Sequence, residues 1–134
     1  MNQEQRNEQK KMGFGRFLRS FGYSMEGLSY AYRYEQSMFV HVLATLMVIV
    51  AGTFFKINLF EWLICILLIG LVVATELINT SIEAVVDLSC PKVHPLAKIA
   101  KDTASAAVFI FALTAFICGC FVFIPKIVEF ITTI

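Results

Sequence analysis

The sequence predicts an all-α integral membrane protein with three transmembrane helices per subunit and one amphipathic surface helix before them. Of the 134 residues, 58% are apolar and only 16% are charged, whereas a soluble domain is about 45–50% apolar and about a quarter charged. Three long apolar segments follow a polar amino terminus. A bilayer core of about 30 Å needs roughly 20 apolar residues for each helix that crosses it. We therefore expect residues 1–134 to form a single membrane domain.

Charge and cysteine content exclude several other classes of protein. The net charge is +1, so the chain has no strongly basic surface, and no nucleic-acid partner is expected. The four cysteines do not have the spacing of a metal site, and three of them lie inside apolar segments. We expect all four to pack as small apolar side chains, without a metal or redox role. They are Cys65, Cys90, Cys118 and Cys120.

The amino-terminal part combines a polar tail, residues 1–12, with a predicted surface helix, residues 13–37. Its apolar residues recur at helical spacing on one stripe, whereas Arg16, Arg19 and Glu26 lie off that stripe. A helix of this kind lies on a membrane surface, although a mere anchor would show the same pattern. The stripe consists of Phe14, Phe17, Leu18, Phe21, Met25, Leu28 and Tyr32.

The three spans are predicted at about 38–55, 59–87 and 103–124. Only three residues separate the first two spans, so we expect an antiparallel hairpin. The second span is expected to continue without a break to residue 87, because neither Gly nor Pro occurs between Leu71 and Cys90. Pro95 is suited to the first turn of the helix that leads into the third span.

The basic residues indicate how the chain crosses the plasma membrane. Nine of them lie before the first span or in the second loop, and two lie on the opposite side. The excess of Lys and Arg marks the cytoplasmic side, so we expect a multi-pass protein with its amino terminus and the 88–102 loop in the cytoplasm. The nine are Arg6, Lys10, Lys11, Arg16, Arg19, Arg33, Lys92, Lys98 and Lys101, and the two are Lys56 and Lys126.

Polar chemistry enters the membrane at the end of the second span. At about 100° per residue, Glu76, Asn79, Glu83 and Asp87 share one stripe of the helix. Glu76 is expected near the inner boundary of the hydrocarbon, where an ionisable group suggests a function. Three carboxylates on one face repel each other unless a cation neutralises them, and Mg²⁺ prefers carboxylate oxygen.

A basic face follows in the second loop and the start of the third helix. Lys98, Lys101, Asp102 and Ser105 fall within an arc of about 100°. A solvated cytoplasmic loop would explain the lysines, but not their pairing with an acidic face at the same depth. Carboxylates that hold Mg²⁺ beside lysines that hold phosphate suggest a nucleotide site. The glycine motifs of P-loop, Rossmann and protein-kinase folds are absent.

These segments resemble the prokaryotic diacylglycerol kinase family, which consists of small integral-membrane lipid kinases. The similarity lies in Glu76-x-x-Asn79-x-x-Ile82-Glu83-x-x-Val86-Asp87, His94, and Ala100-Lys101-Asp102-x-x-Ser105-Ala106-Ala107-Val108. Phe55-Lys56-Ile57, Glu61-Trp62-Leu63 and Phe123-Ile124-Pro125-Lys126 are similar to its Gram-positive undecaprenol kinase branch. The resemblance implies a homotrimer with active sites shared between subunits, ATP as phosphoryl donor and Mg²⁺ as cofactor.

The resemblance also implies roles for individual residues. Glu76 would be the general base at the lipid hydroxyl, supported by Asn79, with Ser105 near the reacting end of the lipid. Glu35 and Glu83 would hold the Mg²⁺. The residues expected at ATP are Arg16, Tyr23, Glu35, Glu83, His94, Lys101 and Asp102. The chain departs from the branch at Gln36 and Phe39, where two basic residues are usual.

The function expected on this basis is Mg²⁺-assisted phosphorylation of undecaprenol to undecaprenyl phosphate. Phosphorylation of diacylglycerol to phosphatidic acid is the alternative, because both lipids present a hydroxyl at the interface. A non-enzymatic protein that conducts protons or cations, with Glu76 as relay, is a more remote alternative. An ion-conducting function gives no reason for the Lys101–Asp102 pair.

Overall fold

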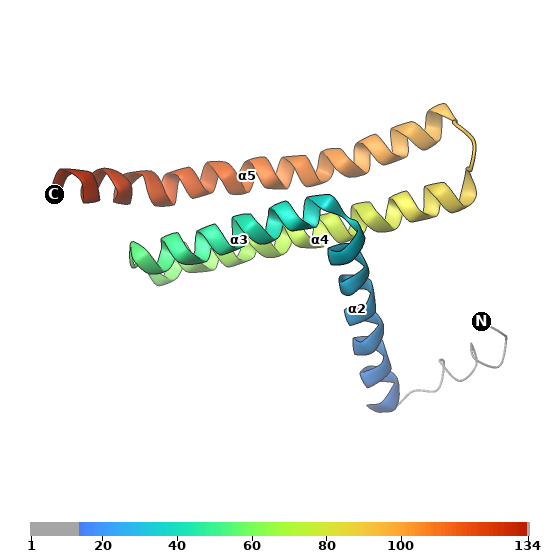
Figure 1. Ribbon diagram of the computed structural model, residues 1–134, viewed down its shortest axis with the longest axis horizontal. Coiled ribbons are helices and arrows are strands. Elements are labelled where there is room, and N and C mark those ends of the chain that lie inside the picture. Colours follow the sequence, from blue (N-terminus) through green and yellow to red (C-terminus); the bar gives the residue numbers. More distant parts are fainter. Residues whose placement is uncertain (1–13, 134) are drawn as a thin grey trace. The chain divides into compact units, whose positions relative to one another are not determined.

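The computed structural model describes residues 14–133, and every regular element among them is a helix (Figure 1). The helices are α2 (Phe14–Tyr34), α3 (Gln36–Phe54), α4 (Leu59–Ser89) and α5 (Pro95–Thr133). The last three of these are long and apolar enough to cross a membrane. The all-helical class and the three apolar membrane-length helices are therefore confirmed. The predicted polar tail, residues 1–12, lies outside the described residues.

The chain divides into two compact units, Met1–Tyr34 and Glu35–Ile134. The described part of the first unit is α2, a helix of 21 residues. It is shorter than the predicted segment 13–37, because the backbone of Glu35 is extended, with φ −97° and ψ 116°. Glu35 thereby occupies the N-cap position of α3, without a capping hydrogen bond from its side chain.

The second unit begins with the predicted hairpin of α3 and α4. Lys56 adopts a left-handed conformation with φ 52°, and the Ile57 N–H donates to the carbonyl of Gly52 at 3.0 Å. Asn58 and Glu61 then form a capping box at the start of α4. The Asn58 side chain accepts from the Glu61 N–H at 3.0 Å, and Glu61 Oε2 accepts from the Asn58 N–H at 2.7 Å. This reciprocal pair satisfies two N–H groups that a helix start leaves open.

The hairpin closes tightly because residue 52 has no side chain. A Cβ atom at Gly52 would lie 2.7 Å from Cη2 of the Trp62 ring, closer than real contacts. We expect Gly52→Ala to destabilise the fold by about 1–3 kcal/mol, since the ring would have to shift. Thermal unfolding in detergent measures this, and Gly70→Ala is the matched control because a Cβ there meets nothing within 4 Å. Equal melting temperatures for the two variants would contradict the expectation.

Helix α4 contacts both α3 and α5, which run alongside it (Figure 1). It is unbroken over 31 residues and ends at Ser89, two residues beyond the predicted limit. It therefore carries the acidic stripe on the same helix as the second span. A small core of Ile57, Cys65 and Val122 lies toward the hairpin end of this unit. The chain turns between α4 and α5 at the opposite end (Figure 1).

Helix α5 extends beyond the predicted span 103–124 at both ends. It begins at Pro95, as expected for a first-turn proline, and it continues past Pro125 to Thr133. A proline inside a helix removes one hydrogen bond, so the last two turns need other support. The Phe130 ring lies 5.5 Å from that of Phe54 and 6.1 Å from that of Phe55. Lys126 also pairs with Glu61 at 3.2 Å, and these contacts hold the helix after Pro125.

Candidate functional site

A buried polar cluster lies on α4, two-thirds of the way along the helix. Glu76, Asn79 and Thr80 are the buried polar or charged side chains among the described residues, and Glu76 is only 4% exposed. The Thr80 hydroxyl donates to the main-chain carbonyl of Glu76 at 3.0 Å. The carboxylate of Glu76 accepts a hydrogen bond from the Ser37 hydroxyl on α3. The structure therefore removes the ionisable group of Glu76 from water, while the predicted function of this carboxylate stays a prediction.

Asn79 follows Glu76 and precedes Glu83 along α4, and only one of its two side-chain polar atoms has a hydrogen-bond partner among the described residues. Its side-chain Nδ2 donates to Glu83 Oε1 at 3.0 Å, which is the contact that helical i, i+4 spacing allows. Its Oδ1 is buried and has no hydrogen-bond partner among residues 14–133, which the structure describes. Buried polar atoms almost always have a partner, so this oxygen is available to accept a hydrogen bond from a ligand or water.

An ion pair joins the end of the acidic stripe to α5. Lys101 Nζ lies 2.6 Å from Asp87 Oδ1, and their side chains are 35% and 67% exposed. The predicted acidic and basic faces therefore meet through this pair. Asp102 instead pairs with Lys98 on its own helix, one turn away, where both are exposed. Exposed ion pairs contribute little to stability, so the Lys101–Asp87 pair matters here because it places the Lys101 ammonium at the end of the acidic stripe.

The remaining predicted site residues have different surroundings. Glu35 is half-buried at the start of α3, and its side chain does not cap the helix. His94 is exposed, and its Nδ1 accepts from the Leu96 N–H at 3.2 Å. Ser105 is exposed on α5. Arg16 and Tyr23 belong to the other unit, where they line a pocket on α2 together with Arg19 and Ser20.

The residues present fit Mg²⁺ when it is bound together with a nucleotide. The part of the chain that the structure describes contains no group of three or more His, Cys, Asp or Glu side chains placed to hold a metal. Mg²⁺ rarely needs such a group, because it is held by one or two carboxylates, substrate phosphates and water. Glu83 is half-buried and accepts one hydrogen bond from Asn79, which leaves lone pairs on its carboxylate for a cation.

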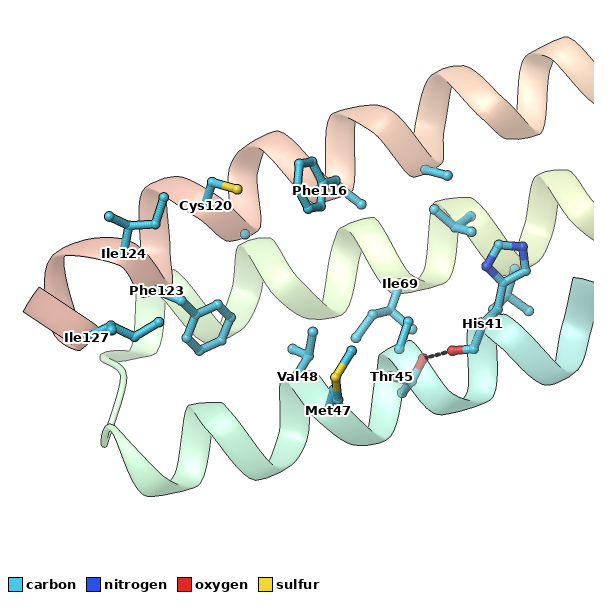
Figure 2. Close-up of a pocket in the computed structure, with 16 residues that line it drawn as sticks. His41, Thr45, Met47, Val48, Ile69, Phe116, Cys120, Phe123, Ile124 and Ile127 are labelled. Atoms are coloured by element: carbon cyan, nitrogen blue, oxygen red, sulfur yellow. Dashed lines mark hydrogen bonds between the residues drawn. The ribbon is translucent and has the colours of Figure 1, made fainter.

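An apolar cavity of about 430 Å³ lies among α3, α4 and α5 (Figure 2). His41 marks one end and Ile127 the other. His41 is one helical turn after Ser37, and the lining residue Val72 is one turn before Glu76. The cavity therefore begins about one turn from the buried carboxylate and leads away from it. Its wall includes His41, Thr45, Met47, Val48, Ile69, Val72, Phe116, Cys120, Phe123, Ile124 and Ile127.

Sequence reasoning did not identify this cavity. Small residues at Ala112, Ala115 and Gly119 follow one face of α5 and leave space opposite α3. Their spacing of three and four residues is the signal that could have indicated it. Sequence reasoning also missed Ser37, because its partner lies 39 residues away on another helix.

Comparison with known proteins agrees with this architecture. Residues 22–123 match the family described as prokaryotic diacylglycerol kinase. The chain belongs to this family. The matched range includes the segments on which the sequence resemblance was based. These are the acidic stripe of α4, the loop with His94, and the start of α5 with Lys101 and Asp102. The prokaryotic diacylglycerol kinases are lipid kinases, so this chain is a lipid kinase.

Individual members of the prokaryotic diacylglycerol kinase family are also similar to the chain. The undecaprenol kinase of Bacillus subtilis is 39% identical over 126 residues, which cover 94% of this chain and 98% of that protein. A diacylglycerol kinase of Helicobacter pylori is 42% identical over 98 residues, or 73% of this chain and 77% of that protein. The diacylglycerol kinase of Escherichia coli K12 is 34% identical over 108 residues, which cover 81% of this chain and 88% of that protein.

Proposed function

We propose that this chain is an undecaprenol kinase that transfers the γ-phosphate of ATP directly to the lipid hydroxyl. The observation that carries the proposal is the extent of the similarity to the Bacillus subtilis undecaprenol kinase, which covers 94% of this chain and 98% of that protein. The two proteins are thus alike in length as well as in sequence. The matches to the two named diacylglycerol kinases cover smaller shares of both chains.

In the proposed reaction, Glu76 accepts the proton of the lipid hydroxyl. The hydroxyl oxygen forms a bond to the γ-phosphorus of ATP while the bond from that phosphorus to the β–γ bridging oxygen breaks, and ADP leaves. The products are undecaprenyl phosphate and ADP. Asn79 supports the base, and its unpartnered Oδ1 accepts a hydrogen bond in the occupied site. Ser105 lies near the reacting end of the lipid.

The nucleotide would be held on the cytoplasmic side of the base. Phosphoryl transfer depends mainly on positioning and charge neutralisation. Mg²⁺ would supply neutralisation of phosphate charge when bound, and Glu35 and Glu83 are the residues that would hold it. Lys101, kept in place by Asp87, would contact the phosphates. The other proposed ATP contacts are Arg16, Tyr23, His94 and Asp102.

The membrane arrangement follows from the same proposal. ATP comes from the cytoplasm, so the amino terminus and the 88–102 loop lie on that side of the plasma membrane. Helix α2 would lie on the cytoplasmic surface. The apolar cavity begins one turn from Glu76, and it would receive the first isoprene units of the lipid. We propose a homotrimer in which neighbouring subunits share active sites.

Diacylglycerol is the alternative acceptor, because the Helicobacter pylori diacylglycerol kinase is 42% identical to the matched part of this chain. A competition assay separates the two substrates. The full chain in mixed micelles receives equal mole fractions of undecaprenol and diacylglycerol with γ-labelled ATP, and the lipid products are separated. We expect at least about tenfold more label in undecaprenyl phosphate than in phosphatidic acid, a difference of about 1.4 kcal/mol in transition-state binding.

The control for this assay is Glu76→Gln, which should label neither lipid appreciably. A preference for diacylglycerol would overturn the proposed substrate but leave the lipid kinase reaction in place. Ion flux through liposomes without ATP turnover would instead favour the remote alternative, a non-enzymatic protein that conducts protons or cations through Glu76.

A further inference from the structure

The Glu76 carboxylate is held from a second helix. Ser37 lies in the first turn of α3, and its hydroxyl donates to Glu76 Oε1 on α4. Among the described residues, this is the side-chain hydrogen bond made by the buried carboxylate. Ser37 is half-buried, whereas Glu76 is 4% exposed. A donor that lies so close in space and 39 residues away in sequence connects the proposed base to the start of the first span.

This contact has two physical consequences for the carboxylate. A buried ionised group needs hydrogen-bond donors to offset the water it has lost, and the Ser37 hydroxyl is one such donor. A bond to Oε1 also restricts rotation of the carboxylate plane, so that Oε2 remains the oxygen available to a second partner. Ser37 is the second residue of α3, and the positive end of that helix dipole favours a negative charge beside it.

We propose that Ser37 is a positioning residue that holds Glu76 so that the second carboxylate oxygen meets the lipid hydroxyl. The inference rests on the proposed function, because it assigns Ser37 to the reaction in which Glu76 is the base. Correct placement of a catalytic group is worth a large factor in rate, and small displacements are costly. The hydroxyl acts through Glu76 and touches neither substrate.

The test compares Ser37→Ala, Ser37→Thr and Ser37→Cys in the full chain, in micelles containing undecaprenol. We expect Ser37→Ala to lower kcat about 10- to 100-fold while KM for ATP stays within about twofold. Ser37→Thr keeps the hydroxyl and should recover most of the activity. Ser37→Cys keeps the volume with a weaker donor, and it should fall between Ala and the wild type.

The matched control is Ser81→Ala on α4, the same loss of a hydroxyl. Ser81 is exposed and donates to the carbonyl of its own helix at Leu77, 2.8 Å away, so its variant should keep wild-type kcat. A double variant, Ser37→Ala with Glu76→Gln, should be no slower than Glu76→Gln alone, because Ser37 acts through Glu76. Thermal unfolding of each variant is measured in the same preparation.

The outcomes separate this inference from the proposed function. A wild-type chain that phosphorylates no lipid overturns the proposed function itself. If the wild type is active and Ser37→Ala retains its kcat, the role of Ser37 is overturned and the kinase stands. A loss that Thr does not restore, or one that multiplies with the loss from Glu76→Gln, also overturns it. If Ser37→Ala does not fold, the wild type is compared with Ser37→Thr and Ser37→Cys alone. Wild-type kcat in Ser37→Cys, or a large loss of kcat in Ser37→Thr, then overturns the role of Ser37.

Discussion

Replacement of Glu76 by Gln is expected to lower kcat by about 100- to 10,000-fold, the range that a general base contributes. Gln has the same shape and keeps an oxygen that can accept the hydrogen bond from Ser37, so the contact between α3 and α4 should persist. It has no charge and does not accept the proton of the lipid hydroxyl. KM for ATP should change little, because the base acts on the lipid.

Steady-state kinetics with undecaprenol and ATP measure this effect, and thermal unfolding shows whether the variant remains folded. Glu129→Gln is the matched control, since Glu129 is exposed near the end of α5 and should behave as the wild type. Retention of more than about a tenth of the wild-type kcat by a folded Glu76→Gln variant would show that another group takes the proton.

Loss of the Glu83 carboxylate is expected to have the second largest effect. We expect Glu83→Ala to reduce turnover about 100-fold or more at ordinary Mg²⁺, because loss of a ligand weakens binding of the ion, and the ion's stabilisation of phosphate charge is worth several kcal/mol. Additional Mg²⁺ should restore only part of the activity. The change also removes the acceptor of the Asn79 Nδ2 hydrogen bond, so two effects must be separated.

Glu83→Gln separates them, because the amide keeps an acceptor for Asn79 but loses the negative charge. If Glu83 is a ligand of Mg²⁺, activity measured across a Mg²⁺ titration should be low in both variants. A defect in Glu83→Ala alone would assign Glu83 to the support of Asn79. Full activity of either variant at ordinary Mg²⁺ is incompatible with a ligand that the reaction needs.

Much of the fold could be predicted from the sequence because it depends on local pattern. Apolar runs of membrane length predict α3, α4 and α5, and the short connection at residues 56–58 predicts the hairpin. The continuation of α4 to Ser89 follows from the absence of Gly and Pro after Leu71. The length of α5 could not be predicted in this way. Its extension past Pro125 is supported by Phe130 and Lys126, which contact residues distant in the sequence.

In the candidate site, too, contacts within one helix could be predicted from the sequence, and contacts between helices could not. Helical spacing alone brings Asn79 to Glu83, so the stripe on α4 could be predicted. The contact of Ser37 with Glu76 and the cavity beside it depend on how three helices pack. No periodicity within one segment determines such contacts. The pairing of Lys101 with Asp87 rather than with its neighbour Asp102 likewise follows from the position of α5 against α4.

The most direct measurement follows the γ-phosphate of labelled ATP in proteoliposomes that contain undecaprenol and the full chain. If Glu76 activates a lipid hydroxyl at the cytoplasmic surface, the wild type transfers the label to undecaprenyl phosphate, and Glu76→Gln transfers almost none. Release of the label only as inorganic phosphate, or equal transfer by the two chains, would contradict the proposed role of the buried carboxylate.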